Sequence, residues 1–347
     1  MLNKLDLDGF RRTRKRTVEF LDHHAELDRR QSAMFRAFRE LQDLIPQTLQ
    51  KAFSGHTFPL LQAQDELRNC VALAHIGFYQ HAIVGLRWVL ELGVLSVYWD
   101  RTNTAERDIQ EWLASDADTP FKRHIVDGLM GIPNVARYCE QSSFRVDLET
   151  LYGELSNYQH VKGMRYSSHH HTPLGSSVRF SEDAFERWIE LAFEVVRLVT
   201  TVHLLKYPVA LQDMPVDQKF GLNGPMGGFL NPCQANELRS LFEAEELTEL
   251  QEISDGDPEA RALAEEFQRR PDITEEQLQQ QFLRDDQFWI EQQGFRSWLR
   301  EELKLHPAKD SDAETDPDFL SRVAELKAWA SERGWLEHGR RGPTTLA

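Results

Sequence analysis

The chain of 347 residues is long enough for two domains or for one large domain with additions, and 41% hydrophobic residues is enough to form a buried core. A formal net charge of −16 argues against general DNA binding and against binding to an anionic membrane, because phosphate contacts need clustered Lys and Arg. The charge is uneven, since residues 11–16 carry a basic run while most of the acidic surplus follows residue 240. We interpret both regions as solvated helix faces and leave a local basic patch open.

Compartment is indicated by the cysteines and by the apolar segments. The three cysteines lie far apart and form no C-x-x-C pair, which indicates neither a zinc knuckle nor a disulfide framework and fits a reducing compartment. The first residues lack the apolar stretch of a secretory signal. Residues 83–99 are interrupted by Arg87 and Glu91 and are shorter than the roughly 20 apolar residues of a membrane span. We therefore expect a cytoplasmic protein with no membrane segment.

The chain as a whole predicts an all-α fold, because apolar residues recur at helical spacing and no alternating run of β-branched residues stands out. Residues 1–58 predict two helices or one kinked helix, forming an N-terminal hairpin. Apolar residues in this segment follow one another by threes and fours, as in a coiled-coil seam: Met34, Phe38, Leu41 and Ile45. The seam needs a partner, which is either the rest of the chain or a second copy.

Residues 59–208 predict a central bundle of the four-helix type. The four principal helices are expected over residues 60–74, 78–99, 146–161 and 181–205. Gly77 permits a tight turn between the first two, which makes them a helical hairpin. Ser181 is a suitable N-cap for the last helix, and Pro208 follows its end.

The rest of the chain predicts a linker and an acidic helical domain. Residues 209–233 hold the densest set of Gly and Pro and are taken as the linker, and residues 234–347 form the acidic C-terminal domain. Three helix starts stand out there, at Asp257, at Thr274 with Gln277 in a capping box, and at Asp316. An apolar stripe is expected from Trp289, Phe295, Trp298, Leu299 and Leu303.

Two of the bundle helices carry matching polar stripes. Arg87 and Glu91 are four residues apart on an otherwise apolar helix, and Tyr152, Ser156 and His160 are spaced by fours on another. Because buried charges need partners, we expect the stripes to meet as a polar seam in which Glu91 accepts a hydrogen bond from His160, Ser156 or Tyr152.

These stripes also carry a resemblance. The residues concerned are Gly77, Ala82, Leu86, Arg87 and Glu91, followed, after a loop at residues 112–120, by Tyr152, Leu155, Ser156 and His160. The pattern resembles that of uncharacterised bacterial helical proteins related to the HEPN superfamily, over residues 60–205. The resemblance implies a helical bundle that often dimerises, a setting in toxin–antitoxin or antiviral defence systems, and, in active members, metal-independent cleavage of RNA.

The resemblance also implies a catalytic pair, an Arg followed four to six residues later by a His. The His then acts as general acid or base and the Arg holds a phosphate. Similar spacings recur elsewhere in the chain, as at Arg68 and His75, so the motif alone localises nothing. Arg165 and His170 directly follow the helix that carries His160, and these three are our candidate catalytic residues.

A third possibility is a metal site, because His169, His170 and His171 are consecutive and imidazole is a common ligand. Consecutive side chains diverge, so we interpret this run as a polar turn and assign neither a metal nor a cofactor. The leading hypothesis is a protein that acts through association with a protein partner or a second copy. The alternatives are an endoribonuclease, with RNA as the partner, and a metal-binding helical protein.

Overall fold

The computed structural model describes residues 7–45, 57–100, 106–170, 179–212, 214–224, 227–305 and 316–340. Across these ranges the regular structure consists of sixteen α-helices and four short 3-10 helices, with no strand, which confirms the all-α prediction. The chain divides into two compact units. Unit 1 comprises Met1–Val216 and Pro225–Arg270, and unit 2 comprises Asp217–Gly224 and Pro271–Ala347.

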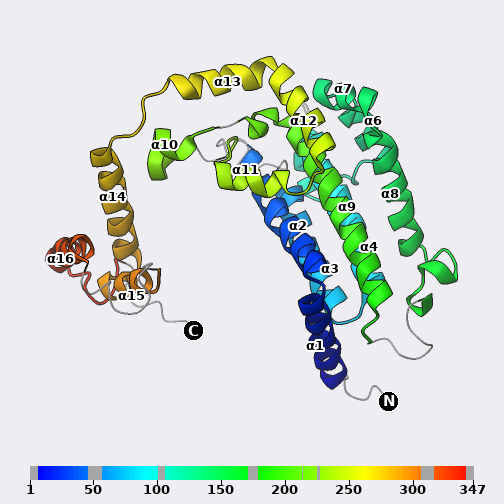
Figure 1. The fold of residues 1–347 in the computed structure, drawn as a ribbon, viewed down its shortest axis with the longest axis horizontal. Helices are drawn as coiled ribbons and strands as arrows, with labels where there is room; N and C mark the ends of the chain where they lie inside the picture. The colour runs from blue at the N-terminus through cyan, green and yellow to red at the C-terminus, as the bar shows by residue number, and fades with distance from the viewer. Residues whose placement is uncertain are drawn as a thin grey trace. The chain divides into compact units, whose positions relative to one another are not determined.

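Unit 1 is a helical bundle centred on α4 (Tyr79–Trp99), which contacts α3 (Thr57–His75), α8 (Phe144–Gln159) and α9 (Glu182–Lys206) (Figure 1). These are the four principal helices expected from the sequence. The turn between α3 and α4 depends on Gly77, whose φ is +87° and whose added Cβ would lie 2.8 Å from the carbonyl oxygen of Arg179. At the start of α9 the Ser181 hydroxyl accepts a hydrogen bond from the amide of Ala184, as predicted for an N-cap.

Three shorter helices complete this part of unit 1, namely α5 (Glu106–Leu113), α6 (Lys122–Leu129) and α7 (Pro133–Gln141). Among the described residues, α4 alone is long and apolar enough to cross a membrane by length and composition, and 67% of its apolar window is buried inside the protein. Its apolar side chains are used in packing against the neighbouring helices.

The N-terminal helices belong to unit 1. Helix α1 (Leu7–His23) is followed by α2 (Ala25–Leu44), and α2 packs on α3 and α9. The expected seam is fully buried by these contacts, at Met34, Phe38, Leu41 and Ile45. The partner of the seam is therefore the rest of the chain, and its apolar side chains are not exposed to a second copy. The N-terminal segment is not a separate element.

The expected boundary at residues 209–233 differs from the observed one. After the 3-10 helix η3 (Pro208–Leu211), helices α11 (Pro232–Arg239), α12 (Ala244–Gly256) and α13 (Pro258–Arg269) all belong to unit 1. Leu230, Leu238 and Leu250 are buried, so the Gly- and Pro-rich stretch is anchored on both sides by apolar contacts that local composition does not reveal. The acidic residues after 240 are thus divided between the two units.

Unit 2 contains α14 (Glu275–Gln293), α15 (Phe295–Leu305) and α16 (Pro317–Glu332). Residues 217–224, with most of α10 (Val216–Phe220) and the 3-10 helix η4 (Gly221–Asn223), pack against the start of this unit. The contacts include the amide of Ile273 donating to the Gln218 carbonyl at 2.8 Å and the Gln281 amide donating to the Phe220 carbonyl at 2.9 Å. Residues 217–224 are therefore bound to helices that begin after residue 271, some fifty positions later in the chain.

Helix starts and the apolar stripe of the C-terminal region were predicted with different success. The expected N-caps all accept hydrogen bonds from backbone amides, at Asp257, Thr274 and Asp316. Of the predicted stripe, Phe295 and Trp298 are buried and Leu299 packs partly against them, but Trp289 and Leu303 are 48% and 47% exposed. The core of unit 2 is completed by Ile290, Leu326 and Ala330, which helical spacing around Trp289 did not single out.

A close approach of α4 to α9 gives a testable stability prediction. A Cβ added to Gly93 would lie 2.7 Å and 2.8 Å from the two methyl carbons of Val199. Because Val199 is β-branched and restricted in a helix, we expect Gly93→Ala to lower the free energy of unfolding by about 1–3 kcal/mol, measured by urea denaturation. The matched control is Gly153→Ala in α8, where a Cβ meets nothing within 4 Å and a gain of about 0.5–1 kcal/mol is expected. Equal effects of the two changes would contradict the close approach.

Candidate functional site

The predicted polar seam is present in part, between α4 and α8. The Arg87 guanidinium donates from Nε to Glu91 Oε1 at 2.9 Å and from Nη1 to the Ser156 hydroxyl oxygen at 2.9 Å. The two stripes therefore meet through Arg87. Glu91 accepts its hydrogen bond from Arg87 on its own helix, and not from a side chain of α8 as expected. Both charged side chains are partly exposed, so this network is a half-buried one.

Tyr152 and His160 do not join the seam. The Tyr152 hydroxyl is buried without a hydrogen-bond partner in the described part of the chain, and burial raises the pKa of this phenol. His160 follows the last residue of α8 and is exposed, so the prediction that it is part of the buried polar seam is wrong. The physical reason is that the helix ends at Gln159 and Val161 takes a positive φ of 47°, which turns the chain away one residue after His160.

The three candidate catalytic residues share one exposed segment. His160, Arg165 and His170 are all exposed, and the last two lie in consecutive 3-10 turns, η1 (Met164–Tyr166) and η2 (Ser168–His170). The Arg165 guanidinium lies 5.5 Å from the centre of the Tyr166 ring. The three residues are therefore neighbours along one exposed segment.

The histidine run is only partly visible. His171 and the side chain of His169 lie outside the described residues, which leaves His170. Within the described ranges, no group of three or more His, Cys, Asp or Glu side chains is placed to hold a metal ion. The structure gives no geometry on which the metal alternative could be argued.

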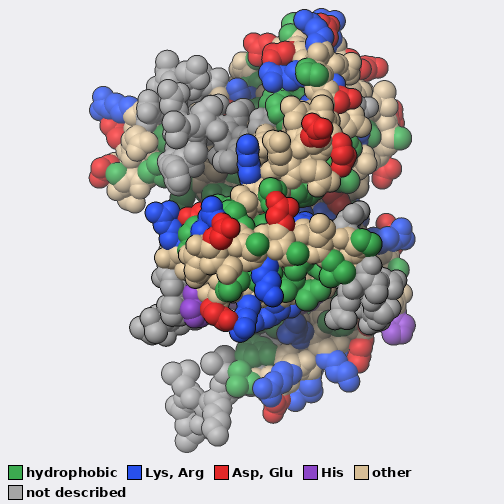
Figure 2. Space-filling model, turned by 90° about the vertical axis from the view of Figure 1, so that its left-hand side faces the viewer, with side chains coloured by type: hydrophobic (Ala, Val, Ile, Leu, Met, Phe, Trp, Pro, Cys, Tyr) green, Lys and Arg blue, Asp and Glu red, His purple; other side chains and the backbone are tan. Residues whose placement is uncertain are grey.

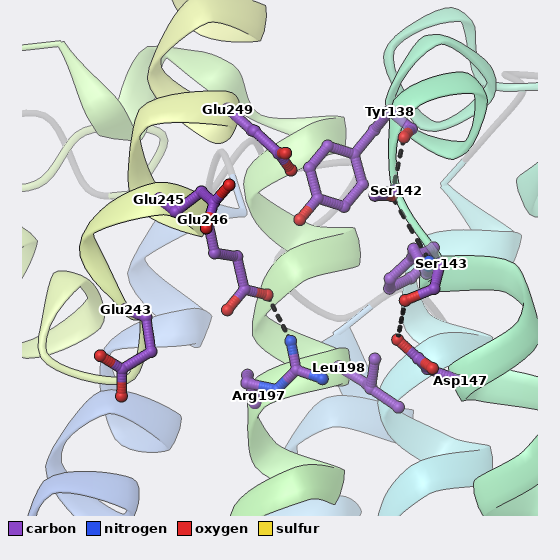
Figure 3. A pocket seen from close by; sticks show the side chains of 11 residues that line it. Tyr138, Ser142, Ser143, Asp147, Arg197, Leu198, Glu243, Glu245, Glu246 and Glu249 are labelled. Atoms are coloured by element: carbon purple, nitrogen blue, oxygen red, sulfur yellow. Dashed lines mark hydrogen bonds and ion pairs between the residues drawn. The ribbon is translucent and has the colours of Figure 1, made fainter.

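A pocket that sequence reasoning missed lies inside unit 1, between α7, α8, α9 and α12 (Figure 3). Its volume is about 340 Å³, within the range of small-ligand sites. The side chains that line it are Tyr138, Ser142, Ser143, Phe144, Asp147, Arg197, Leu198, Glu243, Glu245, Glu246 and Glu249. Five carboxylates therefore face a single guanidinium.

The guanidinium of Arg197 is fully engaged by carboxylates. It donates from Nε to Glu194 at 3.0 Å and also forms a short ion pair with Glu246 across to α12. Burial raises the pKa of Glu246, and the attraction of Arg197 opposes that rise. Because Arg197 is already paired with Glu194 and Glu246, its positive charge does not neutralise the other carboxylates of the pocket.

The other carboxylates keep the pocket negative. Asp147 accepts a hydrogen bond from the Ser143 hydroxyl at 2.6 Å. Among the described residues, no ion pair is formed by Glu243, Glu245 or Glu249. The pocket thus carries a surplus of negative charge beside low-dielectric protein, which concentrates cations.

Tyr138 places an unused polar group in this negative environment. The residue is 3% exposed, and its ring packs on Phe144 with centroids 6.0 Å apart. Figure 3 shows its hydroxyl pointing into the space bordered by Glu246, Glu249 and Arg197. Burial raises the pKa of this phenol, with the two glutamates adding to the effect. In the described part of the chain the hydroxyl has no protein hydrogen-bond partner and opens onto the pocket.

The arrangement is suited to binding a cation. A guanidinium or ammonium group entering the pocket would meet carboxylate acceptors and the free acceptor capacity of the Tyr138 hydroxyl. Sequence reasoning missed the site because its residues come from segments more than one hundred positions apart, from Tyr138 to Glu249. The only local signal was the acidic run Glu243–Glu249, which by itself is typical of a solvated helix start.

Comparison with known proteins adds nothing to this geometry, since no protein-family model, no characterised protein and no solved structure matches the chain. Function has to be argued from the pocket and its charges.

Proposed function

We propose that this protein acts by non-covalent association and that its acidic pocket binds a cationic group, a guanidinium or a primary ammonium, of a partner molecule. The observation that carries the proposal is the pocket itself, in which five carboxylates and one engaged guanidinium share the lining with Tyr138, whose hydroxyl points into the space beside Glu246 and Glu249. A cationic ligand in this space would be attracted by the surplus negative charge and could donate a hydrogen bond to the hydroxyl oxygen of Tyr138.

Binding, in preference to chemistry, is favoured by the state of the pocket's hydroxyl groups. The Ser142 hydroxyl donates to the Tyr138 carbonyl at 2.7 Å, and the Ser143 hydroxyl donates to Asp147. Neither serine has a histidine beside it among the lining residues, so no activated nucleophile is assembled. The raised pKa of Tyr138 keeps its proton in place at neutral pH.

A single cationic side chain suits the pocket better than a bare metal ion. Carboxylates that bind a metal must converge on one point, and no such convergence occurs in the described residues. A guanidinium presents five donors around a plane and can address several separated acceptors at once. A protein partner in a defence or toxin–antitoxin setting, which the sequence resemblance implies, is one source of such a side chain.

The proposal is tested by titrating the protein with argininamide in an isothermal calorimeter. For a ligand of this size we expect a dissociation constant of about 1 mM at low salt. Tyr138→Phe should weaken binding about tenfold, because a hydrogen bond to a charged group is lost. The same change should leave the melting temperature unchanged, because the hydroxyl makes no protein hydrogen bond in the described part of the chain; a residue that only supports the fold would lower the melting temperature when changed.

A matched control is Glu252→Gln, which removes an exposed carboxylate of α12 outside the pocket and should not alter binding. Glu249→Gln removes one inside it and should weaken binding. If argininamide does not bind, or if the two glutamate variants behave alike, the cation site is wrong.

A further inference from the structure

Helix α1 carries the most concentrated positive charge in the chain. Five of its six residues from position 11 to 16 are Arg or Lys, and all five are exposed. Figure 2 shows Lys and Arg side chains gathered at the lower end of the face in view, where α1 lies in Figure 1. The sequence left a local basic patch open, and the structure places its side chains in solvent.

Neutralisation within the helix is weak. Arg11 pairs with Asp8 at 3.2 Å and Lys15 with Glu19 at 3.5 Å, both between exposed side chains, and such pairs contribute little. Arg14 and Arg16 form no ion pair within the part of the chain that the structure describes. The helix therefore presents net positive charge.

The basic helix and the acidic pocket lie at opposite ends of unit 1. Helix α1 is fixed at the N-terminal end of α9, where the Phe20 ring lies 6.1 Å from the ring of Phe185. The pocket contains Arg197, twelve residues further along α9, which at about 1.5 Å per residue is about 18 Å away. From Phe20 the basic residues run still further from the pocket, as Figure 1 shows for α1 relative to α7 and α12.

A chain built this way cannot place its own basic helix in its own pocket. It can place it in the pocket of a second copy. We infer that the cationic group bound by the acidic pocket is an arginine or lysine side chain from the basic run of α1 in a second copy of this chain, so that copies associate head to tail. This inference depends on the proposed cation site and names its occupant.

Charge complementarity favours this occupant over a nucleic acid. The net charge of −16 opposes the approach of a nucleic acid and of a second copy alike, so the choice between them depends on local charge. The pocket of another copy offers negative charge at a confined site and is present at the same concentration as α1. Because the two surfaces differ, the contact is heterologous and propagates or closes into a ring.

The test uses sedimentation velocity of the full chain and two charge-reversal variants. The helix variant is Arg14→Glu/Arg16→Glu, and the pocket variant is Glu245→Lys/Glu249→Lys. The wild type should show an average mass that rises with concentration at about 20 mM salt and falls to that of one chain at about 500 mM. Each variant alone should stay a single chain, because each has lost one of the two surfaces.

An equimolar mixture of the two variants is the decisive sample. The helix variant keeps the acidic pocket and the pocket variant keeps the basic helix, so the mixture should form a one-to-one pair and nothing larger. A control, Arg261→Glu/Arg284→Glu, reverses as much charge at two exposed arginines elsewhere and should associate like the wild type.

Four results would overturn the inference. If the mixture remains single chains, a second copy is not the occupant of the pocket. The same conclusion follows if the wild type remains a single chain while argininamide still binds, and in that case the cation site itself is retained. Association that the pocket variant retains removes this pairing as well. Binding of a single-stranded RNA oligonucleotide that is lost in the helix variant, with no self-association of the wild type, would instead assign α1 to nucleic acid.

Discussion

Replacing Asp286 by alanine is expected to destabilise unit 2 by about 3 kcal/mol. Asp286 is 4% exposed and accepts a hydrogen bond from Trp298 Nε1 at 3.1 Å and another from Arg322 Nε at 2.6 Å. Without this carboxylate, the indole N–H is left unsatisfied in the core, and Arg322 keeps its ion pair with Glu302 and its position over the Trp298 ring. Arg322 is about one-third exposed, so water screens part of the loss, and we place the effect at the lower end of the range for broken buried pairs.

Urea denaturation followed by tryptophan fluorescence measures this effect. The control is Asp285→Ala, which removes the neighbouring, exposed carboxylate and should change the midpoint very little. Among the described residues, the apolar core cluster of unit 2 contains five buried side chains, so a loss of this size is a large part of what such a small core can supply. A loss below about 0.5 kcal/mol for Asp286→Ala would show that the carboxylate is solvated.

Acidification is expected to destabilise unit 1 through His203. This imidazole is completely buried in α9, with Nδ1 2.8 Å from the Val199 carbonyl oxygen and Nε2 without a partner among the described residues. Burial lowers the pKa of His203 to about 4, although the Val199 contact and nearby Asp100 act in the opposite direction. The folded protein therefore holds this side chain neutral over a range in which an unfolded chain, with an imidazole pKa of about 6.5, binds a proton.

The sign of the effect follows from that difference. The stabilising contribution is fully present above about pH 6.5, falls as the pH decreases, and is lost by about pH 4, for a total of about 3 kcal/mol. Unfolding free energies measured by urea across this pH range should show a smaller slope in His203→Leu than in the wild type. His81→Leu, which removes an exposed histidine of α4, should keep the wild-type slope. Identical slopes for His203→Leu and wild type would mean that folding does not lower the pKa of His203.

Much of the fold could be predicted because it depends on local signals. The cap residues Ser181, Asp257 and Thr274 make their hydrogen bonds within three positions of themselves, and Gly77 marks a turn between neighbouring helices. Such features depend on side chains close together in sequence. The helical periodicity of α4 and α8 likewise brought Arg87 and Ser156 into contact.

The candidate site could not be predicted in the same way, because it depends on where distant helices meet. Helical spacing assigned His160 to the same face as Tyr152 and Ser156, but spacing alone does not say at which residue the helix ends. Tyr138 looks like an ordinary apolar position on α7, and only the approach of α12 surrounds its hydroxyl with carboxylates. An acidic run has the same appearance in sequence whether it faces water or a pocket.

The binding of residues 217–224 to α14 also bears on how the chain matures. During synthesis this segment leaves the ribosome well before the helix that receives it, since 46 residues separate Gly224 from Pro271 and those residues belong to the other unit. Unit 1 can complete its core, including α11 to α13, before α14 has been synthesised and can bind residues 217–224. Residues 271–347, about the last fifth of the chain, therefore join residues 217–224 after unit 1 has had time to fold.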